Sequence, residues 1–152
     1  MNRLLNYAKA HNFERPTLLL DVDKVEENYK KLTKGMPTAH VHYAVKANPQ
    51  KEILERLVSL GSRFDAASMG EIVMCINAGA APEHISFGNT VKRVQDIQYA
   101  YATGIRLFAV DADEEVVKKA QHAPGSDVFV RMLVESTEAE WPLSKKFGCD
   151  TD

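Results

Sequence analysis

Apolar and polar positions along the chain alternate between two periods, one typical of strands and one typical of helices. Glycine, proline, asparagine and aspartate separate these runs, as expected where strands and helices end. The runs predict strands over 17–22, 39–45, 64–66, 85–87, 107–110 and 128–134, and helices over 24–34, 51–60, 68–79, 94–102 and 114–120. Strand followed by helix throughout predicts right-handed crossovers and a parallel sheet.

A lysine closes the second of these strands. Side chains alternate along a strand, so His40, His42 and Ala44 are expected to share a face with Lys46. A partly desolvated lysine amine is a nucleophile that forms a Schiff base with a carbonyl substrate or with pyridoxal phosphate. The alternative is a solvated lysine where a strand meets a loop, which is the common situation for this residue type.

Two architectures fit the repeated order of strand and helix. The sheet either closes into a barrel or stays open and doubly wound, and the period and length of the runs do not separate the two. No Gly-x-Gly-x-x-Gly follows the first expected strand, and there is no Walker-type phosphate loop. A nucleotide-binding open sheet is therefore disfavoured.

Length and composition fit one globular domain of 152 residues, 45% of them hydrophobic. The net charge of −2 gives no electrostatic reason to expect nucleic acid or an anionic membrane as a partner. We find no apolar run long enough for a signal peptide or a membrane span, so a cytoplasmic protein is expected. Cys75, Cys149 and the five scattered histidines show no metal-ligand spacing, and no metal is predicted.

Five sequence blocks occur in one order at workable spacings. They are PTLLLDVD at 16–23, YAVKAN at 43–48, FDAAS at 64–68 with Glu71, ISFGN at 85–89 and KKFG at 145–148. Together they resemble the pyridoxal phosphate-dependent ornithine, lysine and diaminopimelate decarboxylase family, and most of all its bacterial-type ornithine decarboxylases. Alanine racemase shares the lysine-bearing strand, but a Tyr-Gly-His segment usually follows its lysine, whereas Ala47, Asn48 and Pro49 follow Lys46 here.

This resemblance implies an α/β fold, a pyridoxal phosphate-binding (β/α)8 barrel of the TIM type, of which the chain holds about five strands. Residues 1–152 would be the N-terminal part of the barrel domain. A leading strand and helix would lie over 15–35, and barrel units would begin at about residue 39. The family's β-rich C-terminal domain would be absent from these residues.

The resemblance also implies decarboxylation of a basic amino acid, above all of L-ornithine to putrescine in polyamine biosynthesis, through a Lys46 Schiff base with pyridoxal 5'-phosphate. Diaminopimelate or lysine decarboxylase, a racemase, a non-catalytic decarboxylase-like regulator and a pyridoxal phosphate-binding carrier remain alternatives. This chain alone is expected to be inactive, because the family's phosphate-binding loop and ring-stacking histidine come later in its sequence. The family implies a homodimer in which Lys146 matches a lysine that reaches toward the partner subunit, and a plain surface lysine is the alternative.

Four residues match the family's cofactor pocket: Lys46, Asp65, Glu71 and Arg131. An anion near Lys46 would stabilise its protonated form, which is the role implied for Asp65 and Glu71. Each match has a structural alternative. Asp65 can simply end a strand, Glu71 is the third residue of a capping box opened by Ser68, and Arg131 suits a buried salt bridge.

Overall fold

The computed structural model describes residues 2–133 and 147–150. Two compact units divide the chain, Met1–Ala39 and His40–Asp152. The first contains helices, and the second contains a sheet with helices between its strands.

The first unit consists of α1 (Asn2–Ala10), α2 (Val22–Gly35) and a connection without regular structure. The helix expected over 24–34 is confirmed, whereas α1 was not predicted. The strand expected over 17–22 is not formed: no described residue pairs with it, and Leu18 is 82% exposed. A strand needs a neighbour for its backbone, and here Asp21 instead starts a helix, because its Oδ1 accepts a hydrogen bond from the N–H of Lys24 at 3.2 Å.

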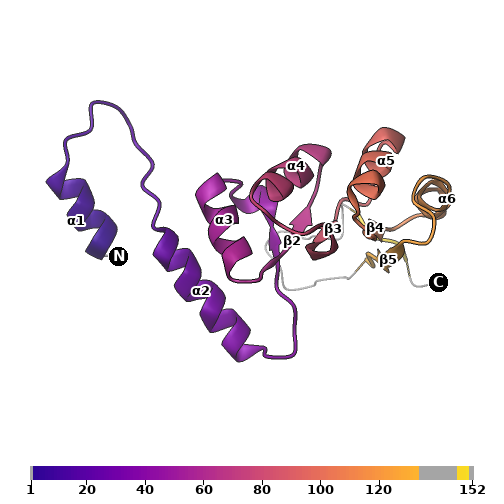
Figure 1. The fold of residues 1–152 in the computed structure, drawn as a ribbon, viewed down its shortest axis with the longest axis horizontal. Helices are drawn as coiled ribbons and strands as arrows, with labels where there is room; N and C mark the ends of the chain where they lie inside the picture. Colours follow the sequence, from indigo (N-terminus) through magenta and orange to yellow (C-terminus); the bar gives the residue numbers. More distant parts are fainter. Residues whose placement is uncertain (1, 134–146, 151–152) are drawn as a thin grey trace. The chain divides into compact units, whose positions relative to one another are not determined.

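The second unit contains a sheet of five parallel strands. Their order is β1 (His42–Ala44), β2 (Arg63–Ala66), β3 (Ile85–Phe87), β4 (Leu107–Val110) and β5 (Asp127–Val130), and each pairs with the next strand in the sequence (Figure 1). A doubly wound sheet reverses its strand order at a switch point, and this sheet does not. The sequential order is that of a barrel segment, so the structure separates the two architectures that periodicity had left open.

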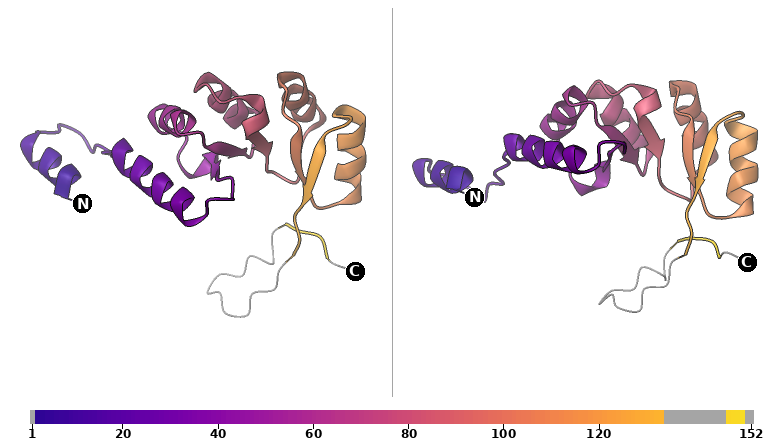
Figure 2. Two further views of the ribbon diagram at one scale, coloured as in Figure 1. Left: turned by 60° about the horizontal axis from the view of Figure 1, so that its bottom comes forward. Right: turned by 90° about the horizontal axis from the view of Figure 1, so that it is seen from below.

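Helices connect the strands and gather along one side of the sheet (Figures 1 and 2). They are α3 (Lys51–Ser59), α4 (Met69–Asn77), α5 (Val94–Thr103) and α6 (Asp113–His122), with short 3-10 turns η1 (Val45–Ala47) and η2 (Pro82–His84). The expected helices are all present, within a few residues of their predicted ends. None of the helices in the described part of the chain is long and apolar enough to cross a membrane.

The hydrophobic core lies between these helices and the sheet. Phe64, Phe87 and Phe108 come from three adjacent strands and are at most 1% exposed. Apolar helix residues that are almost fully buried complete the core: Ile53, Leu54, Leu57, Ile72 and Ile97. Burying a side chain of this size stabilises a fold by about 1.5–3 kcal/mol, so this layer holds the strands in register.

The opposite side of the sheet is called the inner face here, since it would face the interior of a closed barrel. Because side chains alternate along each strand, one row on this face is formed by residues paired in register: Ala44, Asp65, Ser86 and Leu107. At the outer strand β5 all four residues are exposed. The inner face therefore places a carboxylate and a hydroxyl side by side.

Candidate active site

The four residues predicted to hold the cofactor all lie at or beyond the C-terminal ends of strands. Lys46 lies in η1 directly after β1, and Asp65 is the third residue of β2. Glu71 lies in the first turn of α4, and Arg131 follows β5. Since all the strands run in one direction, these positions lie along one edge of the sheet, the edge at which barrel enzymes build active sites. Their role as cofactor ligands stays a prediction.

Lys46 carries a free amine on a fixed stretch of backbone. The strand expected to reach it stops two residues earlier, and η1 takes its place. This turn buries the Val45 side chain completely, and the Tyr43 hydroxyl donates a hydrogen bond to the carbonyl of Asn48 over 3.1 Å. Lys46 itself is exposed, and its Nζ has no hydrogen bond or ion pair with any described residue. The amine is therefore held in place by its backbone but not used by a partner.

Asp65 faces a hollow on the inner face. Its neighbours in register are Ala44 on β1 and Ser86 on β3. The Ser86 hydroxyl donates a hydrogen bond to Asp65 Oδ1 over 2.9 Å. The hollow has a volume of about 350 Å³ and is lined by His42, Ala44, Asp65, Ser86, Leu107 and Phe129. Lys46 is not among these residues, so the structure joins Asp65 to His42 and Ser86 rather than to the lysine.

His42 lies beside Ser86, with its Nδ1 3.4 Å from the hydroxyl oxygen. Burial lowers the pKa of His42 below its usual value of 6.5 and outweighs the opposing effects of the Phe64 carbonyl and of the Asp65 charge. The ring is therefore uncharged at neutral pH. The alternation of side chains along the strand had already predicted that His42 shares a face with Lys46. Ser86 was not predicted, although the sequence shows it as a hydroxyl residue between two apolar strand residues.

Glu71 takes part in the start of α4. The Ser68 hydroxyl accepts a hydrogen bond from the N–H of Glu71 at 3.3 Å, and Glu71 Oε2 accepts one from the N–H of Ala67 at 2.7 Å. The expected helix start at Ser68 is thus confirmed, although the carboxylate reaches Ala67 and not the N–H of Ser68. One carboxylate oxygen is engaged with the loop after β2, which fixes Glu71 at the same edge as Lys46.

Arg131 and Lys46 lie at opposite sides of the sheet, since β1 and β5 are its two outer strands. The Arg131 guanidinium lies over the ring of Phe147, 5.6 Å from its centroid, and the residue is exposed. It pairs with no carboxylate among the described residues, so the buried salt bridge considered for it is not formed there. Its charge is available to an anion at this edge. Lys146, the expected dimer contact, lies outside the described residues.

Lys92 is a buried lysine that the sequence analysis missed. It lies between β3 and α5, and its side chain is fully buried. Its Nζ donates hydrogen bonds to the carbonyls of Asn89, Thr90 and Ala109 at 2.8, 2.9 and 2.6 Å, and lies 3.7 Å from a Glu115 oxygen. An ammonium group has three donors, and all three are used. No sequence pattern distinguishes it from a solvated loop lysine.

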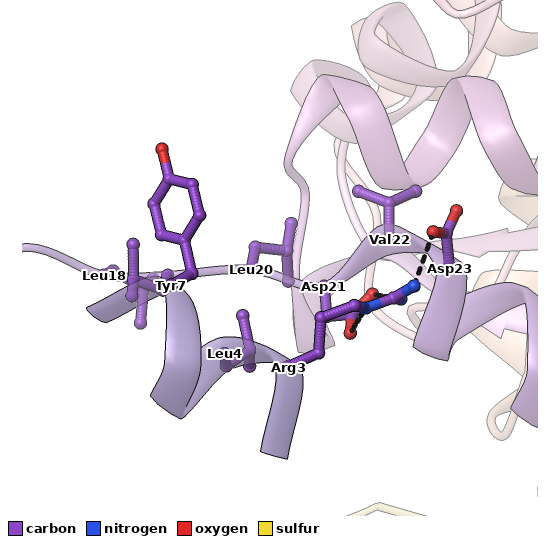
Figure 3. Close-up of a pocket in the computed structure, with 9 residues that line it drawn as sticks. Arg3, Leu4, Tyr7, Leu18, Leu20, Asp21, Val22 and Asp23 are labelled. Atoms are coloured by element: carbon purple, nitrogen blue, oxygen red, sulfur yellow. Dashed lines mark hydrogen bonds and ion pairs between the residues drawn. The ribbon is translucent and has the colours of Figure 1, made fainter. Parts of the chain in front are cut away.

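A second hollow, of about 450 Å³, lies within the unit Met1–Ala39 (Figure 3). Leucine and tyrosine side chains from α1 and from the residues before α2 line it. Arg3 pairs with Asp21 and, at 3.1 Å, with Asp23. Arg3 and its two aspartates are thus paired with one another at this hollow, and none of the four residues predicted to hold the cofactor lines it.

The residues at the C-terminal edge suit the chemistry of pyridoxal phosphate. Lys46 supplies a primary amine that no other described residue binds, and such an amine binds an aldehyde covalently. Asp65 and Glu71 supply negative charge, and Arg131 supplies positive charge at the same edge. In the described part of the chain, no three His, Cys, Asp or Glu side chains are arranged to hold a metal ion.

The sequence matches a family of pyridoxal-dependent decarboxylases and individual decarboxylases. Residues 22–152 match the family described as pyridoxal-dependent decarboxylase, pyridoxal binding domain. The lysine/ornithine decarboxylase of Selenomonas ruminantium is 38% identical over 143 residues, which cover 94% of this chain and 36% of that enzyme.

Solved structures of two decarboxylases have the same fold. The arginine decarboxylase of Paramecium bursaria Chlorella virus superimposes with a TM-score of 0.88 at 28% identity, over 99% of this chain and 42% of its own. The lysine/ornithine decarboxylase of Vibrio vulnificus, complexed with putrescine, gives a TM-score of 0.83 at 31% identity, over 97% of this chain and 38% of its own. The chain thus spans about two-fifths of the length of these relatives.

These similarities confirm the expected α/β barrel fold, of which the chain carries a part. The family description, and a related lysine decarboxylase solved in complex with pyridoxal phosphate, confirm pyridoxal phosphate as the cofactor of the family. The sequential parallel sheet and the position of Lys46 agree with that assignment. The chain therefore belongs to the pyridoxal-binding domain family of the pyridoxal-dependent decarboxylases.

Proposed function

We propose that this chain is the N-terminal part of a pyridoxal phosphate-dependent decarboxylase of basic amino acids, and that its leading reaction is the conversion of L-ornithine to putrescine. The observation that carries the proposal is the amine of Lys46, which has no partner among the described residues and lies at the C-terminal edge of a parallel barrel sheet. Relatives named for lysine, ornithine and arginine support a basic substrate. They do not separate ornithine from lysine, and the choice of ornithine rests on the sequence resemblance.

Each proposed site residue has a separate task. Lys46 holds the cofactor through its amine, and its backbone position is set by the burial of Val45. The cofactor held there would supply the electron sink that decarboxylation of an amino acid needs. Asp65 and Glu71 supply negative charge that keeps a nearby nitrogen protonated, and Arg131 attracts an anionic group.

We propose further that the full polypeptide is a homodimer with active sites shared between subunits, and that Lys146 takes part in the contact. This rests on the family resemblance of the segment KKFG at 145–148. Sedimentation of the full polypeptide, with Lys146→Glu as the variant, tests this assembly.

Replacement of Lys46 tests the proposed function. In the polypeptide that contains these residues together with the rest of the barrel, pyridoxal phosphate should produce a visible absorption band, and borohydride should attach the cofactor to Lys46. Lys46→Ala should lose the band and ornithine decarboxylation, because Lys46 is the lysine of the turn η1, directly after β1. Lys51→Ala is the matched control, since Lys51 is an exposed lysine close by in the sequence. A band that survives in Lys46→Ala, or cofactor trapped on another lysine, would overturn the assignment.

A further inference from the structure

The carboxylate of Asp65 is directed toward β3. The Ser86 hydroxyl on β3 donates a hydrogen bond to Asp65 Oδ1 over 2.9 Å, and Ser86 is itself 3% exposed. Ala44, the other neighbour of Asp65 in register, has no polar side-chain atom to offer. The hydrogen bond therefore draws the carboxylate away from β1, the strand that precedes Lys46.

Gly88 provides the space that this carboxylate occupies. A Cβ atom placed on Gly88 would lie 1.9 Å from Asp65 Oδ1 and 2.5 Å from Asp65 Cγ. The backbone of Gly88 does not have a positive φ, unlike Gly61, Gly79 and Gly104. An L-residue could adopt this backbone, so it is the carboxylate and not the chain geometry that excludes a side chain here. Ser86 and Gly88 together form a niche for Asp65.

Lys46 lies in a turn that contacts the strand carrying this carboxylate. It lies two residues beyond Ala44, whose partner in register is Asp65, and η1 packs against β2. A lysine ammonium and a carboxylate attract one another, and an exposed lysine side chain can turn toward a nearby carboxylate. Yet Asp65 and Lys46 form no ion pair in the structure.

The neutral ring of His42 does not form an ion pair with the Asp65 carboxylate. Its Nδ1 faces the Ser86 oxygen at 3.4 Å, which is a long contact. Because burial lowers the pKa of His42, the ring has no positive charge to offer Asp65 at neutral pH. The Ser86 hydroxyl and the space left by Gly88 therefore set the direction of the Asp65 carboxylate.

We propose that Ser86 and Gly88 are positioning residues that hold the Asp65 carboxylate in the niche on β3 and keep it from pairing with Lys46 before the cofactor binds. This inference rests on the proposed role of Lys46 as the cofactor lysine. An amine paired with a carboxylate stays protonated and is a poor nucleophile, whereas an unpaired amine reacts more readily with an aldehyde. The niche thus keeps Lys46 reactive while leaving a negative charge close by.

Amine labelling of this chain without any cofactor tests the niche. Ser86→Ala and Gly88→Ala should release the carboxylate, and Lys46 should then react about two- to fivefold more slowly with an acylating reagent, the range set by an exposed ion pair. Mass spectrometry of the labelled peptides measures the rate. Ser86→Thr keeps the hydroxyl beside the hollow and should restore the normal rate.

Matched controls separate this effect from general disturbance. Ser62→Ala removes another buried serine hydroxyl, which donates to the Arg63 carbonyl, and Gly70→Ala adds a Cβ that meets nothing closer than Ser68 Oγ at 3.8 Å. Neither should change the labelling of Lys46. Combining Ser86→Ala with Asp65→Asn should abolish the slow labelling, because the competing charge is then gone.

The outcomes distinguish the niche from the proposed function. Unchanged labelling of Lys46 in both Ser86→Ala and Gly88→Ala would overturn the niche, even if pyridoxal phosphate attaches to Lys46. Slow labelling of Lys46 that persists when Ser86→Ala is combined with Asp65→Asn would also overturn the niche. Conversely, the expected labelling pattern without any cofactor band in the longer polypeptide would support the niche and reject the proposed function.

Discussion

Lys46 and Lys92 are two lysines at the same edge of one sheet, in opposite environments. Lys46 follows β1, is exposed, and has no partner in the described part of the chain. Lys92 follows β3, is fully buried, and donates three hydrogen bonds to backbone carbonyls. Burial alone would have pointed to Lys92 as the reactive residue. The unused amine of Lys46 is the better sign of a nucleophile, because a lysine whose three donors are satisfied is part of the framework.

The environment of Lys92 also explains how the loop after β3 is held. Two of its carbonyl partners, Asn89 and Thr90, lie in that loop, while Ala109 lies on β4. The lysine therefore joins the loop to the neighbouring strand, close to the niche formed by Gly88. A structural lysine at this point stabilises the edge that carries the proposed site.

The largest expected effect is on stability, from Lys92→Met. The substitution leaves three carbonyls without this donor and removes one of the two cations beside Glu115, so the free energy of unfolding should fall by about 3–5 kcal/mol. Lys46→Met should change it by less than about 0.5 kcal/mol, since Lys46 is exposed and has no partner among residues 2–133 and 147–150. Urea unfolding followed by circular dichroism measures both. Equal losses of unfolding free energy in the two variants would show that Lys46 and Lys92 contribute equally to stability.

A smaller loss is expected from Glu115→Gln. Glu115 is 7% exposed, and its Oε2 has no hydrogen bond with a described residue but lies 3.7 Å from Lys92 Nζ. Removing this charge takes the nearest carboxylate away from the buried ammonium and also breaks the pair of Glu115 with Lys118, at a cost of about 1–3 kcal/mol. Glu55→Gln, which loses only an exposed pair with Lys51, is the control. A Glu115→Gln chain as stable as the control would mean that the carbonyls alone balance the charge of Lys92.

The smallest effect concerns pH. Burial lowers the pKa of Lys92 from 10.5, although the charge of Glu115 opposes the shift. Between the lowered pKa and 10.5 the unfolded chain binds more protons than the folded chain, so Lys92 makes stability rise with pH in that window, by at most about 1.4 kcal/mol per unit. Urea unfolding from pH 8 to 10.5 should therefore show a more positive slope for the wild-type chain than for Lys92→Met. Identical slopes would show that Lys92 has the same pKa in both states.

Local sequence patterns predicted much of the fold of the second unit. The strands expected over 85–87 and 107–110 are confirmed residue for residue, because each is a short apolar run between turn residues. The helix start at Ser68 was predicted because a capping box is closed by residues three positions apart. The strand expected over 17–22 was wrong, because three leucines resemble a strand only where another strand is present to pair with them.

The sequence by itself determined where the strands and helices of the second unit lie, the family and the lysine at the C-terminal edge, since these depend on neighbours along the chain. Only the tertiary structure decided the environments of the side chains. Ser86 meets Asp65 across 21 positions, and Lys92 meets Ala109 across 17. Strand register and loop closure bring such pairs together, and the pattern of apolar and polar residues within one segment does not show which distant residue will lie beside it. For that reason the free lysine, the buried lysine and the niche around Asp65 could be distinguished only in the folded chain.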